Sequence, residues 1–252
     1  MNVFWLEQTG TDVPENDDWL AGRERLYVER LRIPKRRSDW RLGRWTAKRA
    51  IAAFLRAPYD PEMLARIEIR SAASGAPLAF RENAPAAVSI SITHRCGIAA
   101  CAVAPPEMAI GCDLELIEPR SDAFLTDYFT VAEQALLARF PAAERVVFSN
   151  LLWSAKESAL KVLKVGLRID TRCVEVSLGE NPPTEAEEFL RGLTHSSNFD
   201  EPRPFEEWFP LSVCCANGQS FRGWWMPMCD LVRTIVTAPS AGAPLILRTV
   251  PH

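Results

Sequence analysis

Residues 109–116 read Ala-Ile-Gly-Cys-Asp-Leu-Glu-Leu, and this stretch decides the fold that the sequence predicts. Because side chains two positions apart share one face of a strand, Asp113 and Glu115 point one way while the apolar residues point into a core. Like charges so close are unfavourable unless a cation lies between them, and carboxylate oxygens suit magnesium. The same Asp-x-Glu pattern also occurs on the solvated face of a strand, so spacing alone leaves both interpretations open.

The rest of the chain predicts a mixture of strands and helices around this segment. A half-buried strand is expected at 88–93 and another at 98–104, and the short connections to 109–116 favour antiparallel neighbours. Further strands are expected at 3–6, 67–70, 173–178, 211–216, 221–226 and 232–236. Helices are expected at 17–31, at 39–56 with Ser38 as N-cap, at 130–140 behind a capping box, and at 142–165.

The order strand, helix, helix and strands occurs before Pro105 and again after it. This order predicts an α+β fold made of two similar halves, residues 1–106 and 107–252, without a residue-level repeat. The proline-containing last residues are expected to form a tail or a loosely attached edge, and Pro182-Pro183 is expected to lie in a surface loop.

The composition is that of a globular protein, with 48% hydrophobic and 24% charged residues, which excludes global disorder. No apolar run approaches the roughly 20 residues that span a bilayer. The N-terminus lacks the pattern of a signal peptide, so we expect a cytoplasmic protein. The seven cysteines include no Cys-x-x-Cys pair and are expected to be reduced core thiols, not disulfides or a zinc site.

Positive charge is concentrated in one segment. Residues 23–56 contain twelve basic and three acidic residues, although the whole chain has a formal net charge of -3. This asymmetry predicts an anion site, with nucleic acid or a polyphosphate as candidates. The acidic remainder of the chain would repel a long duplex, so a compact anion fits better. A solvated helix face explains the same charges without a ligand.

The stretch 153–161 reads Trp-Ser-Ala-Lys-Glu-Ser-Ala-Leu-Lys and is expected to be helical. Glu157 and Lys161 are four residues apart and share a helix face. They form either a simple ion pair or a third metal carboxylate with a lysine that neutralises a phosphate. His94 ends the strand at 88–93, where a structural role and a ligand role are both open. The sequence motifs of P-loop, Rossmann, serine-hydrolase and zincin proteins are absent.

Together, the stretches 110–115 and 153–161 resemble the signature motifs of Sfp-type 4'-phosphopantetheinyl transferases. Supporting matches are Thr93-His94, Gly43-Arg44 through Lys48, and Ser74-Gly75-Ala76-Pro77, so the resemblance covers roughly half of the chain. It implies a pseudo-dimer of two α+β halves, with coenzyme A and Mg2+ bound at an active site in the cleft between them. It also implies magnesium-dependent transfer of the 4'-phosphopantetheine arm to a serine hydroxyl of an apo carrier protein, with release of adenosine 3',5'-bisphosphate.

The resemblance implies roles for individual residues. Asp113, Glu115 and Glu157 would bind the metal, Glu157 is also the candidate general base, and Lys161 would meet the phosphate under attack. The implied cofactor contacts are Lys35, Arg44, Lys48, Thr93, His94 and Lys156.

The implied partners are acyl, peptidyl or aryl carrier proteins of fatty-acid, polyketide or nonribosomal-peptide synthesis. We expect a monomer that binds neither nucleic acid nor a membrane. The alternative is a non-catalytic module that binds nucleic acid or a carrier protein.

The chain departs from the family pattern in three places. Ala76 stands where the family often has lysine, Lys164 replaces a frequent glycine, and Arg95-Cys96-Gly97 replaces the usual small residues. None of these departures removes a metal carboxylate. Activity is therefore expected, with an altered affinity for coenzyme A.

Overall fold

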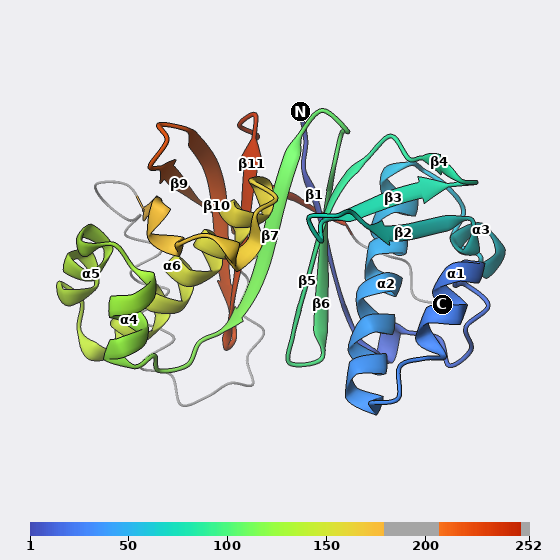
Figure 1. The fold of residues 1–252 in the computed structure, drawn as a ribbon, viewed down its shortest axis with the longest axis horizontal. Coiled ribbons are helices and arrows are strands. Elements are labelled where there is room, and N and C mark those ends of the chain that lie inside the picture. Colours follow the sequence, from blue (N-terminus) through green and yellow to red (C-terminus); the bar gives the residue numbers. More distant parts are fainter. Residues whose placement is uncertain (179–206, 248–252) are drawn as a thin grey trace.

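The computed structural model describes residues 1–178 and 207–247 (Figure 1), and the loop expected at Pro182-Pro183 lies outside these residues. The first sheet has the strand order β12-β1-β6-β5. Its strands are β1 (Phe4–Thr9), β5 (Ser89–Arg95), β6 (Ile98–Ala104) and β12 (Leu245–Ile246). β1 and β5 each pair antiparallel with β6, and β12 pairs parallel with β1. The last described residues therefore form an edge strand, one of the two predicted outcomes.

Helix α2 (Pro34–Phe54) packs on the first sheet through Trp45, Ile51 and the alanines between them. The helix begins at Pro34, not at Asp39, because proline lacks only an N–H that the first turn leaves unpaired. Ser38 therefore lies inside the helix and is not its N-cap.

Helix α1 (Gly22–Val28) is shorter than the predicted helix at 17–31. Its N-terminus is fixed where Glu24 Oε2 accepts a hydrogen bond from the Ala21 amide at 3.0 Å. A third, smaller sheet has strands β2 (Ile67–Ser71), β3 (Pro77–Arg81) and β4 (Ala84–Pro85) in that order. The short helices here are η1 (Gly10–Asp12) and α3 (Pro61–Ala65).

The second large sheet has the order β7-β11-β10-β9-β8. Its strands are β7 (Ala109–Leu116), β8 (Val174–Ser177), β9 (Phe209–Cys215), β10 (Ser220–Met228) and β11 (Leu231–Ala238). Helix α6 (Ala142–Val162) packs on it, as α2 packs on the first sheet (Figure 1). The remaining helices are α4 (Asp122–Tyr128), α5 (Val131–Ala138), η2 (Gly166–Arg168) and η3 (Thr171–Cys173). The structure is thus a mixed α+β fold, as predicted.

The prediction that the strand at 109–116 pairs with its neighbour at 98–104 is wrong. β5 and β6 pair antiparallel as expected, but β7 pairs along its whole length with β11 instead of β6. β7 still contacts β5, because the Cys112 amide donates to Ser91 Oγ at 3.0 Å. An ion pair also joins the sheets, with Arg233 of β11 2.8 Å from Glu7 of β1. β7 therefore lies where the two sheets meet.

All seven cysteines are free thiols in this structure. Cys101 and Cys112 are buried in the core, but Cys96, Cys214 and Cys229 are exposed, so the prediction of core thiols is wrong for these three. Cys214 is exposed because it lies on the outer face of β9, where buried and exposed residues alternate. Within the described ranges, no helix is both long and apolar enough to cross a membrane.

Candidate active site

Asp113 of β7 is the centre of a polar cluster between the two sheets. Its side chain is buried, and its Oδ1 accepts hydrogen bonds from Lys161 Nζ at 2.9 Å and from Thr93 Oγ1 at 3.1 Å. Its Oδ2 is also buried but has no hydrogen-bond partner among the described residues. A buried carboxylate oxygen normally has a partner, so Oδ2 is a free acceptor for a cation or a donor.

Glu157 of α6 lies near Asp113 and Glu115, so the charges of both carboxylates act on it. Burial raises the pKa of Glu157 to about 7, and the negative charges of Asp113 and Glu115 add to the increase, while Lys161 opposes it. The helix spacing predicted from the sequence thus brings Glu157 and Lys161 to Asp113. A carboxyl group with a pKa near neutrality can accept or release a proton under ordinary conditions.

Lys161 is the cation of this cluster. Its ammonium donates to the Cys112 carbonyl at 2.7 Å as well as to Asp113. Burial lowers the pKa of Lys161, but the charges of Asp113, Cys112 and Glu157 and the hydrogen bond to Asp113 together outweigh it, so the pKa lies above its ordinary value. Lys161 therefore stays charged and neutralises part of the Asp113 carboxylate.

Glu115 has two partners that the sequence did not reveal. Its Oε1 accepts from Trp153 Nε1 at 3.2 Å, and its Oε2 accepts from Arg120 at 3.0 Å. Arg120 lies in the loop after β7 and also donates to Asn150 at 2.8 Å. No sequence pattern marks Arg120, because its role depends on the loop returning to Asn150 in the middle of α6. Arg120 at 3.0 Å and Arg95 at 3.8 Å thus balance the charge of Glu115 in this arrangement.

The acidic cluster fits a divalent cation in part. Within residues 1–178 and 207–247, no three His, Cys, Asp or Glu side chains are arranged as a ready metal site. Among the described residues, Lys161 is the one cation shared by Asp113 and Glu157, so the free Oδ2 of Asp113 and the raised pKa of Glu157 indicate two carboxyl groups whose negative charge is only partly balanced. Two carboxylates suffice for magnesium, which takes its other ligands from water and substrate phosphates. Glu115 could become a third ligand only if the ion replaced Arg120 beside its carboxylate.

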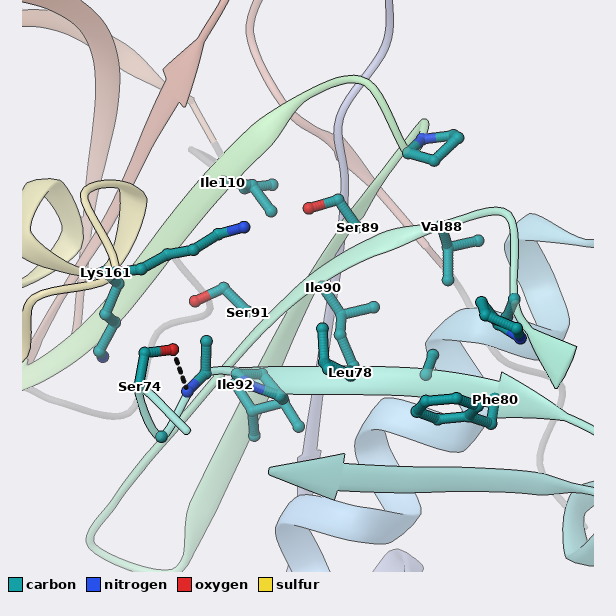
Figure 2. A pocket seen from close by; sticks show the side chains of 18 of the residues that line it. Ser74, Leu78, Phe80, Val88, Ser89, Ile90, Ser91, Ile92, Ile110 and Lys161 are labelled. Atoms are coloured by element: carbon teal, nitrogen blue, oxygen red, sulfur yellow. Dashed lines mark hydrogen bonds between the residues drawn. The ribbon is translucent and has the colours of Figure 1, made fainter. Parts of the chain in front are cut away.

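A pocket of about 530 Å³ opens beside Lys161, between the β3–β5 region and the α6–β7 region. Figure 2 shows Ser89 and Ser91 along its length, apolar Leu78, Ile90 and Ile92 nearby, and Lys161 across from the serines. The walls are mainly apolar, and Lys161 and Lys164 bring positive charge to one end. The pocket suits an elongated ligand that has an anionic group and an apolar part.

The other residues that were predicted to contact coenzyme A lie in different environments. Thr93 is buried and donates to Asp113, so it orients a carboxylate of the cluster. His94 is exposed at the end of β5. Arg44 lies over the Trp40 ring at 4.9 Å and lines a second pocket of about 390 Å³. Lys35 is 86% exposed and pairs with Asp39.

Lys48 and Lys156 require a correction, because both side chains are completely buried. Lys48 Nζ lies 2.6 Å from Glu24 and donates to the Trp19 and Leu64 carbonyls. Lys156 Nζ lies 2.8 Å from Glu133 and donates to the Thr171 and Val174 carbonyls. These ammonium groups have all their donors engaged in the core. We therefore treat them as structural residues instead of cofactor contacts.

Replacing Lys48 by Met is expected to lower the free energy of unfolding by about 3 kcal/mol, because the buried Glu24 would lose its nearest counter-charge and keep only Arg44 at 3.7 Å. Replacing the exposed Lys35 by Met should change it by less than about 0.5 kcal/mol. Chemical denaturation of both variants measures the difference. Equal stability of the two variants would contradict the structural role of Lys48.

Known proteins resemble this chain in one region. No curated protein matches it. Among solved structures, one match is the holo-[acyl-carrier-protein] synthase (AcpS) of Helicobacter pylori in complex with coenzyme A, with 19% identity and a TM-score of 0.29, covering 41% of this chain and 98% of that chain. Residues 109–211, which include the Asp113–Glu157–Lys161 cluster, match the family model ACPS, so this part of the chain is similar to the 4'-phosphopantetheinyl transferase superfamily.

Proposed function

We propose that the protein transfers the 4'-phosphopantetheine group of coenzyme A to a serine hydroxyl of an apo carrier protein. The observation that carries this proposal is the contact of Asp113, Glu157 and Lys161 beside a pocket with one cationic end, within the region similar to the superfamily. Transfer needs a proton acceptor for the serine and positive charge near the phosphates. The cluster offers both.

The reaction forms a bond between the serine oxygen and the phosphorus next to the pantetheine arm. The bond from that phosphorus to the oxygen of the leaving adenosine 3',5'-bisphosphate breaks, and the serine proton passes to the Glu157 carboxylate. Glu157 suits this role because a pKa of about 7 allows it to be ionised before the reaction and protonated after it. Lys161 holds Asp113 in place and adds positive charge on the side where negative charge develops.

Asp113 and Glu157 are the residues that would hold Mg2+, with Glu115 as a third candidate beside them. A bound divalent cation supplies positive charge next to the phosphates and the leaving group. Without an ion, the Asp113 and Glu157 carboxyl groups face each other unfavourably. This repulsion keeps their oxygens available for a ligand and favours magnesium dependence.

We also propose that the two halves, residues 1–106 and 107–252, form a pseudo-dimer with the active site in the cleft between them. A matching buried ion pair in each half supports this arrangement. Glu24 Oε1 accepts from the Ile69 amide of β2 at 3.0 Å, and Glu133 Oε1 accepts from the Val176 amide of β8 at 2.8 Å. Each glutamate accepts a hydrogen bond from the N-cap amide of its short helix and pairs with a buried lysine of the long helix. α2 and α6, with 21 residues each, then correspond.

Within the superfamily, we propose that the protein belongs to the Sfp-type branch and acts as a cytoplasmic monomer. The similar halves within one chain support a monomer, because each half supplies what a second copy would otherwise bring. Lys35, Arg44 and His94 remain proposed coenzyme A contacts, since each presents a polar side chain outside the core. The proposed carriers belong to fatty-acid, polyketide or nonribosomal-peptide synthesis.

Incubation with coenzyme A, Mg2+ and an apo carrier tests the proposal. Chromatography should detect adenosine 3',5'-bisphosphate only when all three are present, and a carrier whose acceptor serine is replaced by alanine serves as the control. Release of the bisphosphate without any carrier would indicate hydrolysis and would contradict transfer.

Arg30, Arg32 and Arg36 favour a second candidate, a module that binds nucleic acid. They are exposed, and within the described part of the chain their side chains make no ion pair or hydrogen bond. This function predicts binding to oligonucleotides that weakens steeply with salt and does not need Asp113 or Glu157. A gel-shift titration of the wild type and an Asp113→Asn variant distinguishes it from the transferase.

A further inference from the structure

Lys164 occupies the turn that ends helix α6 and has a left-handed backbone, with φ of 57°. The Val165 amide donates to the Leu160 carbonyl at 3.2 Å, and the Lys164 amide donates to the Lys161 carbonyl at 3.1 Å. This pair of bonds is the Schellman motif, in which glycine is preferred at the position that Lys164 holds. A lysine is therefore strained there compared with glycine.

The same turn lies at the edge of the 530 Å³ pocket. Lys161 and Lys164 are the ionisable residues that line this pocket, and no acidic side chain among its described lining residues balances them. Lys161 is already committed to Asp113 and to the Cys112 carbonyl. The side chain of Lys164 has no hydrogen bond or ion pair within the described residues. Lys164 is thus the cation of this pocket that is available to a ligand.

The β2–β3 turn that also lines the pocket lacks such a cation. It contributes Ser74, Gly75, Ala76 and Pro77, and none of their side chains carries a charge. A ligand with phosphate groups in the pocket can therefore gain charge-assisted hydrogen bonds from the α6 side only. The serines of β5 offer neutral hydrogen bonds further along.

We infer that Lys164 binds a phosphate group of coenzyme A in this pocket and sets the affinity for it. This inference rests on the proposed function, because it takes coenzyme A as the ligand. At this position lysine favours the binding of coenzyme A, whereas glycine would favour the stability of the folded protein. Stability and affinity should therefore change in opposite directions when Lys164 is replaced by glycine.

The structure offers a matched control in Arg56, at the end of α2. Arg56 also has a left-handed backbone, with φ of 53°, and its turn contains the same two hydrogen bonds, Ala57 to Ala52 and Arg56 to Ala53. Arg56 is exposed and does not line the pocket. Arg56→Gly thus removes a cation and relieves the same strain without touching the proposed site.

The test is titration calorimetry of coenzyme A together with thermal unfolding. Lys164→Gly and Arg56→Gly should both raise the melting temperature by about 2–4 °C. Only Lys164→Gly should weaken coenzyme A binding, by about tenfold, which is typical of losing a charged hydrogen bond. Lys164→Arg keeps the charge and should bind nearly as well as the wild type.

The binding measurements distinguish a failure of the role of Lys164 from a failure of the proposed function. If the wild type binds coenzyme A and Lys164→Gly binds it equally well, the role of Lys164 is wrong while the proposed function stands. If the wild type does not bind coenzyme A at all, both the proposed function and this inference fail. A melting temperature that falls in Lys164→Gly would show that the variant is damaged, and Lys164→Asn, which also tolerates this backbone, then decides the binding comparison.

Discussion

Replacing Glu157 by Gln is expected to lower kcat by about 10²- to 10⁴-fold while the protein remains folded. The amide keeps the size of the side chain but cannot accept the serine proton or provide a carboxylate ligand. Turnover with coenzyme A and an apo carrier measures the effect, and thermal unfolding confirms the fold. Glu144→Gln, in the first turn of the same helix and outside the cluster, is the control and should keep full activity.

The titration of Glu157 adds a pH dependence to this result. Without a metal ion Glu157 loses its proton around pH 7, and a bound cation would lower its pKa, so activity should fall only when the pH drops below neutral. In metal-free protein the folded-state pKa lies above the unfolded value of about 4.5, so the folded state binds more protons between these values. The stabilisation from protonated Glu157 is complete below about pH 4.5 and is lost as the pH rises through 7. Glu157→Gln should lack this loss, and a parallel decline in both proteins would contradict it.

Gly111→Ala is expected to have the largest effect on stability. A Cβ at Gly111 would lie 1.9 Å from the Ser158 carbonyl oxygen and 2.9 Å from Lys161 Cβ, so β7 and α6 would have to separate. We expect a loss of about 4 kcal/mol or more in the free energy of unfolding. The separation would also move Lys161 away from Asp113, and activity should be lost in any protein that still folds.

Gly43→Ala is the matched control for this substitution. In α2 the new Cβ would lie 3.6 Å from Ile92 Cγ2, which is an ordinary contact. Alanine favours a helix interior, so stability should rise by about 0.5–1 kcal/mol. Urea denaturation of both variants gives the comparison. A Gly111→Ala protein as stable as the wild type would show that β7 and α6 are not in close contact.

Local patterns predicted the elements around the site well. Strands 98–104 and 109–116 have the predicted bounds, because their apolar residues are buried along their whole lengths. The spacing of Glu157 and Lys161 placed both near Asp113, because a helix fixes which residues share a face. The capping box at Thr130 also begins α5 as predicted.

Features that depend on distant contacts were not predictable. β7 pairs with β11, more than a hundred residues later, instead of with the strand next to it in sequence. Arg120 meets Glu115 only because a loop returns to α6. The basic helix pattern could not separate Lys48, buried against Glu24, from Lys35, which lies in solvent. The number of charged residues in a segment does not show which of them are buried, because burial depends on the partners that the fold brings to each side chain.

The intact mass of apo carrier proteins after incubation with this protein, coenzyme A and Mg2+ tests phosphopantetheine transfer most directly. A panel of acyl, peptidyl and aryl carriers should include at least one that gains the mass of a single phosphopantetheine group. The gain should map to its acceptor serine and disappear with EDTA or with Glu157→Gln. Unchanged masses across the whole panel, with folded wild-type protein that binds coenzyme A, would contradict the transferase function.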